Sequence, residues 1–297
     1  MGDVVTMDDL TNDEIIEILD CAERLVPVAR GDVILPLLDG KVLANMFFEN
    51  STRTRMSFET AMKRLGGSVL NFSSIGTSVA KGETLYDTMQ MIDGYADVAA
   101  IRHPRQGAAQ YSADAVEIPI LNAGDGAGNH PTQTMLDLFT IREAHGTLEG
   151  LNVVLVGDLR YGRTVHSLSH ALVRFGARLT LVSPNTLRMP DEIVSDLRSH
   201  GAEVTETDSL IDQITEADVI YMTRIQKERF PDEDEYAKVA GIYKLEASDL
   251  SGAKKGMAVM HPLPRVDEID PSVDTTDHAR YFQQAFNGVP TRMALLC

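Results

Sequence analysis

The fold is indicated most clearly by residues 152–183, which have the sequence NVVLVGDLRYGRTVHSLSHALVRFGARLTLVS. Two apolar runs, at 152–157 and 178–183, enclose a stretch with a helical pattern. Short apolar runs bounded by polar residues or glycine predict buried strands. A strand, a helix and a second strand in this order are typical of parallel sheets covered by helices on both faces.

The same alternation extends along most of the chain. Further apolar runs predict strands at residues 41–48, 97–102, 218–223 and 257–261. The segment after Thr11 has the three- and four-residue spacing of a helix, and Thr11 with Glu14 forms a capping-box signature. We therefore predict an α/β fold class with two doubly wound parallel-sheet domains and an interdomain cleft as the ligand site. The boundary is predicted at residues 146–150, between a first domain of residues 1–146 and a second that begins at residue 150.

Composition excludes several classes of protein. The chain has 297 residues, 43% of them hydrophobic and 24% charged, as in an ordinary globular protein of one large or two medium domains. No apolar run approaches the roughly 20 residues of a membrane span, and no signal-peptide pattern opens the sequence. Two cysteines, Cys21 and Cys297, cannot form a disulfide framework or a cysteine-based zinc site. We expect a cytoplasmic protein that does not bind membranes.

The formal net charge of −17 argues against a nucleic-acid partner, because phosphate backbones require a basic surface. The acidic residues are spread along the chain rather than gathered in a tail. Adaptation to a salty cytoplasm and an ordinary acidic protein both explain this balance, and the sequence leaves the two open.

Residues 51–55, with the sequence STRTR, follow a predicted strand and precede a helical pattern that stops at Gly66. A helix N-terminus presents backbone N–H groups and a positive dipole end, which favour an anion. Hydroxyl and guanidinium groups add donors that suit phosphate. The alternative is a capped surface helix whose arginines have no ligand.

Several motifs together resemble one family. FFENSTRTR at 47–55, followed by SFE at 57–59, is similar to the carbamoyl phosphate signature of the aspartate and ornithine carbamoyltransferases. Six further segments match in the expected order, and they are KGET at 81–84, IRHP at 101–104, HPTQ at 130–133, YGRTVHSL at 161–168, MTRIQKER at 222–229 and HPLPR at 261–265. The chain is thereby identified as a member of this family.

The resemblance implies a role for each matching residue. Those expected to bind carbamoyl phosphate are Ser51, Thr52, Arg53, Thr54, Arg102, His130, Gln133, Leu263 and Pro264. Catalysis is assigned to Arg53, Lys81, Arg102 and His130, with His130 donating to the carbonyl oxygen as negative charge develops. Ser78 and Lys81 are expected to enter the site from a neighbouring subunit, with Thr77 as the alternative to Ser78.

The acceptor site is expected in the second domain, at residues 150–282, while the C-terminal helix at 283–297 completes the first domain. The family pattern assigns aspartate to Arg163, Thr164, Arg224 and Gln226, together with Lys81. A dinucleotide site is excluded, because Gly157 and Gly162 lack the G-x-G-x-x-G spacing. For Arg224, a surface ion pair with Glu228 is the alternative.

Aspartate is the expected acceptor. Ornithine enzymes carry a cysteine where this chain has Pro262, and two arginines suit a dicarboxylate but repel a cationic ornithine side chain. The implied reaction is a direct attack of the aspartate amine on carbamoyl phosphate, a step of de novo pyrimidine biosynthesis, with no cofactor and no metal. The leaving phosphate is the proposed proton acceptor. Transfer to another amino acid and a non-catalytic homologue are the alternatives.

The family also implies an assembly. Its members form homotrimers with shared active sites, and this follows here if Lys81 acts on a neighbouring copy. Some members bind a separate zinc-containing regulatory chain. The sequence leaves that partner, and nucleotide feedback, open.

Overall fold

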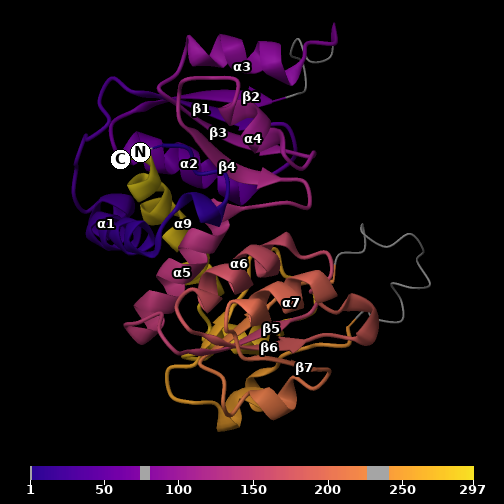
Figure 1. Ribbon diagram of the computed structural model, residues 1–297. Coiled ribbons are helices and arrows are strands. Elements are labelled where there is room, and N and C mark those ends of the chain that lie inside the picture. Colours follow the sequence, from indigo (N-terminus) through magenta and orange to yellow (C-terminus); the bar gives the residue numbers. More distant parts are fainter. Residues whose placement is uncertain (1, 74–80, 226–240) are drawn as a thin grey trace. The chain divides into compact units, whose positions relative to one another are not determined.

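The computed structural model describes residues 2–73, 81–225 and 241–297 of the chain. These residues divide into two compact units, drawn in Figure 1. Unit 1 comprises Met1–Phe139 together with Phe286–Cys297, and unit 2 comprises Thr140–Ala285. The chain therefore leaves unit 1, builds unit 2, and returns to unit 1 for its last residues.

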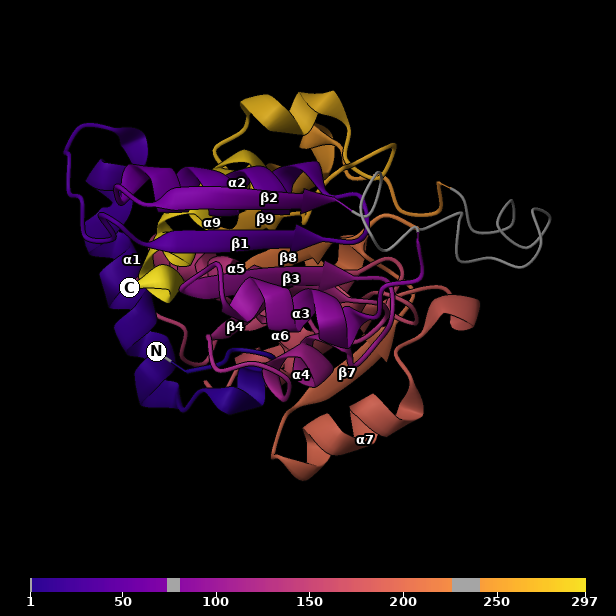
Figure 2. The same cartoon turned by 90° about the horizontal axis from the view of Figure 1, so that it is seen from above.

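Unit 1 is built on a four-stranded parallel sheet with the order β2-β1-β3-β4. Figure 2 shows β2, β1 and β3 lying side by side. The strands are β1 (Val42–Phe47), β2 (Ser68–Ser73), β3 (Val98–His103) and β4 (Ile120–Asp125). Because β1 and β3 are neighbours, the segments that follow them leave from the same edge of the sheet.

Helices cover both faces of this sheet, since alternate strand residues point to opposite sides. Met46 and Ile101 pack in one apolar cluster with Met89 and Ala109, which come from α3 (Leu85–Asp93) and α4 (Ala108–Ala113). On the other side, Asn45 donates to a backbone carbonyl of α2 (Thr52–Arg64). The first helix, α1 (Asn12–Arg30), packs on α2.

Unit 2 contains a five-stranded parallel sheet with the order β7-β6-β5-β8-β9. Its strands are β5 (Asn152–Val156), β6 (Arg178–Val182), β7 (Val204–Thr207), β8 (Val219–Met222) and β9 (Ala258–Met260). Two helices, α6 (Arg163–Val173) and α7 (Asp191–Ser199), lie together over one face of this sheet (Figure 1). Buried residues of β5, β8 and β9 form the core on the other face.

Two helices have residues in both units, namely α5 (Pro131–His145) and α9 (Tyr281–Leu296). Within unit 1 they approach closely at Gly288, where an added Cβ would lie 3.3 Å from a Leu136 methyl group. Short 3-10 helices occur at Met7–Asp9, Asn185–Leu187, Ile211–Gln213, Ala247–Gly252 and Pro271–Thr275.

The α/β class with two parallel sheets is confirmed, as are all six predicted strands, which appear as β1, β3, β5, β6, β8 and β9. The capping box is present in α1, with Thr11 and Glu14 bonding each other's backbone N–H groups. Three strands were not predicted, namely β2, β4 and β7. Among the described residues, no helix is long and apolar enough to cross a membrane.

Candidate active site

The first turn of α2 lies at the carboxyl edge of the unit 1 sheet, directly after β1. Ser51 occupies the N-cap position, yet its side chain makes no capping hydrogen bond. Thr52 and Arg53 are exposed, whereas Thr54 is buried. The hydroxyl of Ser51 is therefore not used as an ordinary helix cap, which favours the anion-site interpretation over that of a capped surface helix.

Arg102 lies near the end of β3, beside the β1 edge that leads into α2. Its Nη2 atom is 2.7 Å from Glu49 Oε1, and its Nη1 donates to the Ala123 carbonyl at 3.3 Å. The side chain is only 15% exposed. The guanidinium already binds one oxyanion, so it is oriented to meet carboxylate or phosphate oxygens at this edge.

His130 precedes α5, which begins at Pro131 as the sequence predicts. The ring is buried, and its Nδ1 lies 3.5 Å from the Thr132 hydroxyl oxygen. Gln133 is half-buried, and its Nε2 donates to Asp137 at 2.9 Å. Both side chains that the family pattern assigns to the carbamoyl group are thus held by α5 itself.

Arg292, which the sequence analysis did not single out, supports this turn from α9. It is fully buried, and it donates to the Thr132 hydroxyl at 3.3 Å and to the Gly288 carbonyl at 3.1 Å. Its guanidinium also lies 5.0 Å above the Phe58 ring. Burial lowers the pKa of Arg292 to about 9, although the Asp137 carboxylate opposes this shift.

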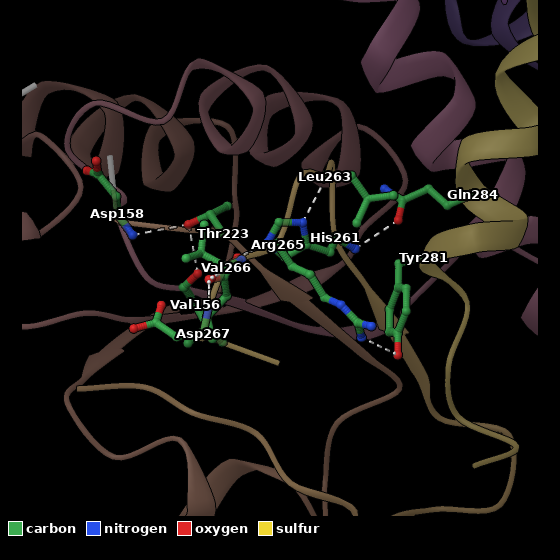
Figure 3. Close-up of polar contacts among 11 residues, drawn as sticks. Val156, Asp158, Thr223, His261, Leu263, Arg265, Val266, Asp267, Tyr281 and Gln284 are labelled. Atoms are coloured by element: carbon green, nitrogen blue, oxygen red, sulfur yellow. Dashed lines mark hydrogen bonds and ion pairs between the residues drawn. The ribbon is translucent and has the colours of Figure 1, made fainter. Parts of the chain in front are cut away.

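In unit 2, the ends of β5 and β8 meet at Gly157. An added Cβ there would lie 2.3 Å from the Thr223 carbonyl oxygen, and Gly157 has a φ of +112°. The Thr223 hydroxyl accepts from the Asp158 N–H at 3.1 Å and donates to the Val156 carbonyl at 2.9 Å, as Figure 3 shows. A glycine at this position therefore allows the two strand ends to approach closely.

These strand ends place two of the expected acceptor residues. Arg163 is the first residue of α6, and Arg224 follows β8; both side chains are half-buried, as is that of Thr164. The turn into α6 is held by His166, whose Nε2–H donates to the Leu159 carbonyl at 2.7 Å, while burial lowers the pKa of this ring. A small pocket at this edge is lined by Gly157, Thr223, Ile225, Gly241, Tyr243, Asp267 and Glu268.

The segment after β9 carries Leu263 and Pro264 at the same edge of the sheet. Leu263 has a φ of 56°, and its N–H donates to His261 Nδ1 at 2.7 Å. Figure 3 shows the His261 ring directed at Leu263, while the His261 main chain meets Gln284. Next to it, Arg265 pairs with Asp274 and donates to the Tyr281 hydroxyl.

The structure thus groups the predicted residues in two sets. The carboxyl edge of the unit 1 sheet carries Ser51–Thr54, Arg102, His130 and Gln133. The carboxyl edge of the unit 2 sheet carries Arg163, Thr164, Arg224, Leu263 and Pro264. Lys81 is exposed, whereas Ser78, its alternative Thr77, and Gln226 lie outside the described residues. The described residues contain no group of three or more side chains that could hold a metal ion.

Family models cover nearly the whole chain. Residues 3–143 match the aspartate/ornithine carbamoyltransferase carbamoyl-P binding domain, and residues 149–297 match the Asp/Orn binding domain of the same family.

Similar proteins agree with these models. The aspartate carbamoyltransferase catalytic subunit of Methanothrix thermoacetophila is 58% identical over 99% of this chain and 96% of its own length, and that of Archaeoglobus fulgidus is 55% identical over 100% and 98%. Among solved structures, the catalytic subunit of M. jannaschii aspartate transcarbamoylase is 50% identical with a TM-score of 0.93, covering 100% of this chain and 97% of that one. The Trypanosoma cruzi enzyme in complex with carbamoyl phosphate and aspartate is 40% identical with a TM-score of 0.94, covering 99% and 95%. The chain belongs to the aspartate/ornithine carbamoyltransferase family.

Proposed function

We propose that this chain transfers the carbamoyl group of carbamoyl phosphate to the amino group of L-aspartate, giving N-carbamoyl-L-aspartate and phosphate. The product places the reaction in de novo pyrimidine biosynthesis. Relatives that are 58% and 55% identical over 96% and 98% of their own length carry this activity in their names, and the T. cruzi relative binds both substrates.

The observation that carries the proposal is the position of Arg102 beside the start of α2. Its 2.7 Å contact with Glu49 lies next to a helix N-terminus whose serine does not cap the helix. Helix N–H groups and a guanidinium at one sheet edge suit a phosphate group, whose negative charge is spread over three terminal oxygens. Arg53, in the same helical turn, adds a second cation.

His130 would polarise the carbamoyl carbonyl. Thr132 accepts a hydrogen bond from Arg292, so its own O–H can donate to His130 Nδ1. The ring proton then belongs on Nε2, from which it can donate to the carbonyl oxygen as negative charge develops. The aspartate amine attacks the carbonyl carbon, the C–N bond forms, and the C–O bond to phosphate breaks. The leaving phosphate takes the amine proton.

The choice of acceptor rests on charge. Arg163 and Arg224 follow neighbouring strands, β5 and β8, and each guanidinium can hold one carboxylate in two parallel hydrogen bonds. Aspartate offers two carboxylates, whereas ornithine would bring a second ammonium group beside these arginines. The two arginines therefore favour aspartate over ornithine as the acceptor.

The experiment measures carbamoyl transfer from carbamoyl phosphate with L-aspartate and, separately, with L-ornithine. We expect product with aspartate only. Arg53→Ala should lower kcat by at least about 100-fold, because it removes a charge that stabilises the transition state. Lys63→Ala is the matched control, since it removes an exposed cation from the other end of α2. Transfer to ornithine would contradict the acceptor assignment, and inactivity with both would support a non-catalytic homologue.

We also propose a homotrimer in which Ser78 and Lys81 of one copy complete the site of its neighbour. Unit 1 exposes a run of apolar side chains, with Val33 at 48%, Ile34 at 90% and Leu37 at 54%. Exposed apolar surface of this kind supports contact with another chain. Mixing inactive Arg53→Ala and Lys81→Ala chains tests the arrangement, because a shared site regains activity in mixed trimers and separate sites do not.

A separate regulatory chain is supported only by the name "catalytic subunit" of the relatives. We propose such a partner and predict that it contains zinc. Capture of the tagged chain from its source cells, followed by metal analysis of any chain bound in a fixed ratio, tests this assignment. Capture of the tagged chain alone would count against it.

A further inference from the structure

The eight residues from His261 to Glu268 are closed into a loop by the side chains at their two ends. His261 Nε2 lies 2.6 Å from Glu268 Oε1. The two side chains are only 1% and 6% exposed. Water therefore cannot replace either partner, and loss of one leaves the other without its hydrogen bond in a buried site.

The hydrogen bonds determine where the His261 ring carries its proton. The Leu263 backbone N–H donates to Nδ1 at 2.7 Å, so Nδ1 must present a lone pair. The ring proton is therefore on Nε2, where it points at the Glu268 carboxylate. A proton on Nδ1 would face the Leu263 N–H and break that contact.

Glu268 is bonded as an ionised carboxylate. Its second oxygen, Oε2, accepts from the Val266 and Asp267 N–H groups, both at 3.1 Å. All the hydrogen bonds to the two Glu268 oxygens come from N–H donors. A carboxylate can accept all of them, whereas a neutral amide cannot. Burial raises the pKa of the Glu268 carboxyl, but the hydrogen bond from His261 and those from the backbone outweigh it and hold the pKa below its usual range.

The backbone held by this network is unusual. Leu263 has a φ of 56°, and it is the one non-glycine residue with positive φ in the part of the chain that the structure describes. A leucine in this conformation costs about 1–2 kcal/mol and persists only where its surroundings enforce it. The His261 ring contacts the Leu263 N–H directly, and the His261 N–H is itself fixed by Gln284 at 2.8 Å.

We propose that Glu268 is a positioning residue for carbamoyl transfer: by keeping the His261 proton on Nε2, it holds the backbone of Leu263 and Pro264 in the position that binds carbamoyl phosphate. The inference rests on the proposed function and on the assignment of Leu263 and Pro264 to the carbamoyl phosphate site, which the family pattern implies. Neither Glu268 nor His261 is required to touch the substrate. Glu268 acts on the ring, the ring acts on the Leu263 N–H, and the loop presents its carbonyl groups.

The test compares Glu268→Gln with the wild-type enzyme. Glutamine keeps the size of the side chain, but it cannot accept from His261, Val266 and Asp267 at once. Because a displacement of about 1 Å at a reacting centre costs up to about 100-fold in rate, we expect kcat to fall by about 10- to 100-fold. Inhibition by inorganic phosphate should remain unchanged, since phosphate is assigned to α2 and Arg102 in unit 1.

A second pair of variants separates positioning from bulk stability. His261→Asn places an amide oxygen near the position of Nδ1, so it can still accept from Leu263, whereas His261→Leu cannot. We expect the asparagine variant to be at least about 10-fold more active than the leucine variant. Similar thermal unfolding of the two variants, measured by calorimetry, is the control. Equal activity of the two would show that the bond to Leu263 does not matter.

Nitrogen-15 NMR of labelled histidine gives a readout that needs no turnover. We expect a neutral His261 ring with its proton on Nε2 in the wild-type protein, and mixed or shifted protonation in Glu268→Gln. A proton on Nδ1 in the wild type would overturn the inference. Full activity of Glu268→Gln would do the same. An inactive wild-type enzyme whose His261 ring has the expected proton would instead count against the proposed function.

Discussion

Replacement of Arg292 by methionine tests how α9 holds the predicted carbamoyl site. Methionine fills a similar length of side chain but removes the guanidinium. The variant loses hydrogen bonds to the Thr132 hydroxyl and the Gly288 carbonyl, and the stacking contact 5.0 Å from the Phe58 ring. It also removes the cation that faces the buried Asp137 carboxylate.

The size of the effect follows from two opposing contributions. Burying the charged guanidinium has a cost in free energy, and it lowers the pKa of Arg292 to about 9 even though the Asp137 carboxylate opposes this shift. The contacts of the guanidinium offset this cost in the folded protein. Removing one member of a buried charge pair leaves the other uncompensated, and destabilises by about 3–5 kcal/mol. We expect this loss for Arg292→Met.

The double variant Arg292→Met/Asp137→Asn isolates the contribution of charge. Asparagine at 137 can still accept from Gln133 Nε2, whose present contact is 2.9 Å, but it carries no charge. Because the double variant carries neither of these two charges, we expect it to recover more than half of the lost stability.

Differential scanning calorimetry provides the measurement. At about 2–4 °C per kcal/mol for a unit of this size, the single variant should melt at least about 6 °C below the wild type. A single variant within about 2 °C of the wild type would refute the reasoning. So would a double variant that is no more stable than the single one.

Three further predictions concern unit 2. Arg224→Ala should raise the KM for aspartate by at least about 10-fold, because it removes charged hydrogen bonds to the substrate. The control is Arg198→Ala, which replaces an exposed arginine of α7 and should leave this KM unchanged. If steady-state assays give Arg224→Ala the same KM as the wild type, Arg224 does not belong to the site. Gly157→Ala should raise the KM for aspartate and lower the melting temperature, because its Cβ would lie 2.3 Å from the Thr223 carbonyl oxygen. If both values stay as in the wild type, this contact relaxes without moving Arg224. Burial raises the pKa of Asp218, but its bonds to the Asn152 N–H and the Lys254 ammonium lower it below 3.8. Asp218 therefore stabilises the protein fully above about pH 4, and this contribution is lost as the pH falls further. In Asp218→Asn, the acid unfolding curve followed by circular dichroism should be less steep below about pH 4. An unchanged curve would contradict the lowered pKa of Asp218.

The sequence predicted the interior strands, and the edge strand β9, because their buried residues form continuous apolar runs. The strands that it missed lack this signal for different reasons. Edge strands β2 and β7 carry polar residues and are partly exposed. The β4 sequence ILNAGD is fully buried, but it contains residues that are rare in strands. Its Asn122 side chain is satisfied by the Val5 carbonyl, a contact that local sequence cannot indicate.

Site residues were predicted where a family motif marks them, and their assigned roles stay predictions. Arg292 and Glu268 lie outside the predicted sets because their importance depends on folded contacts. The Arg292 contact with Thr132 joins positions 160 apart in the chain. Glu268 follows the HPLPR segment at 261–265 by three residues, but the tautomer that it fixes appears only when the His261 and Leu263 contacts are seen together.

The return of Phe286–Cys297 to unit 1 has a consequence for biosynthesis. A ribosome finishes all of unit 2 before it makes Arg292, so unit 2 can reach its native form while unit 1 still lacks a core helix. During that interval Thr132, at the start of α5, lacks its hydrogen bond from the Arg292 guanidinium. The nascent chain then presents this part of unit 1 to chaperones and proteases. Early termination of translation within the last twelve residues would therefore yield a chain with a complete unit 2 and an incomplete unit 1.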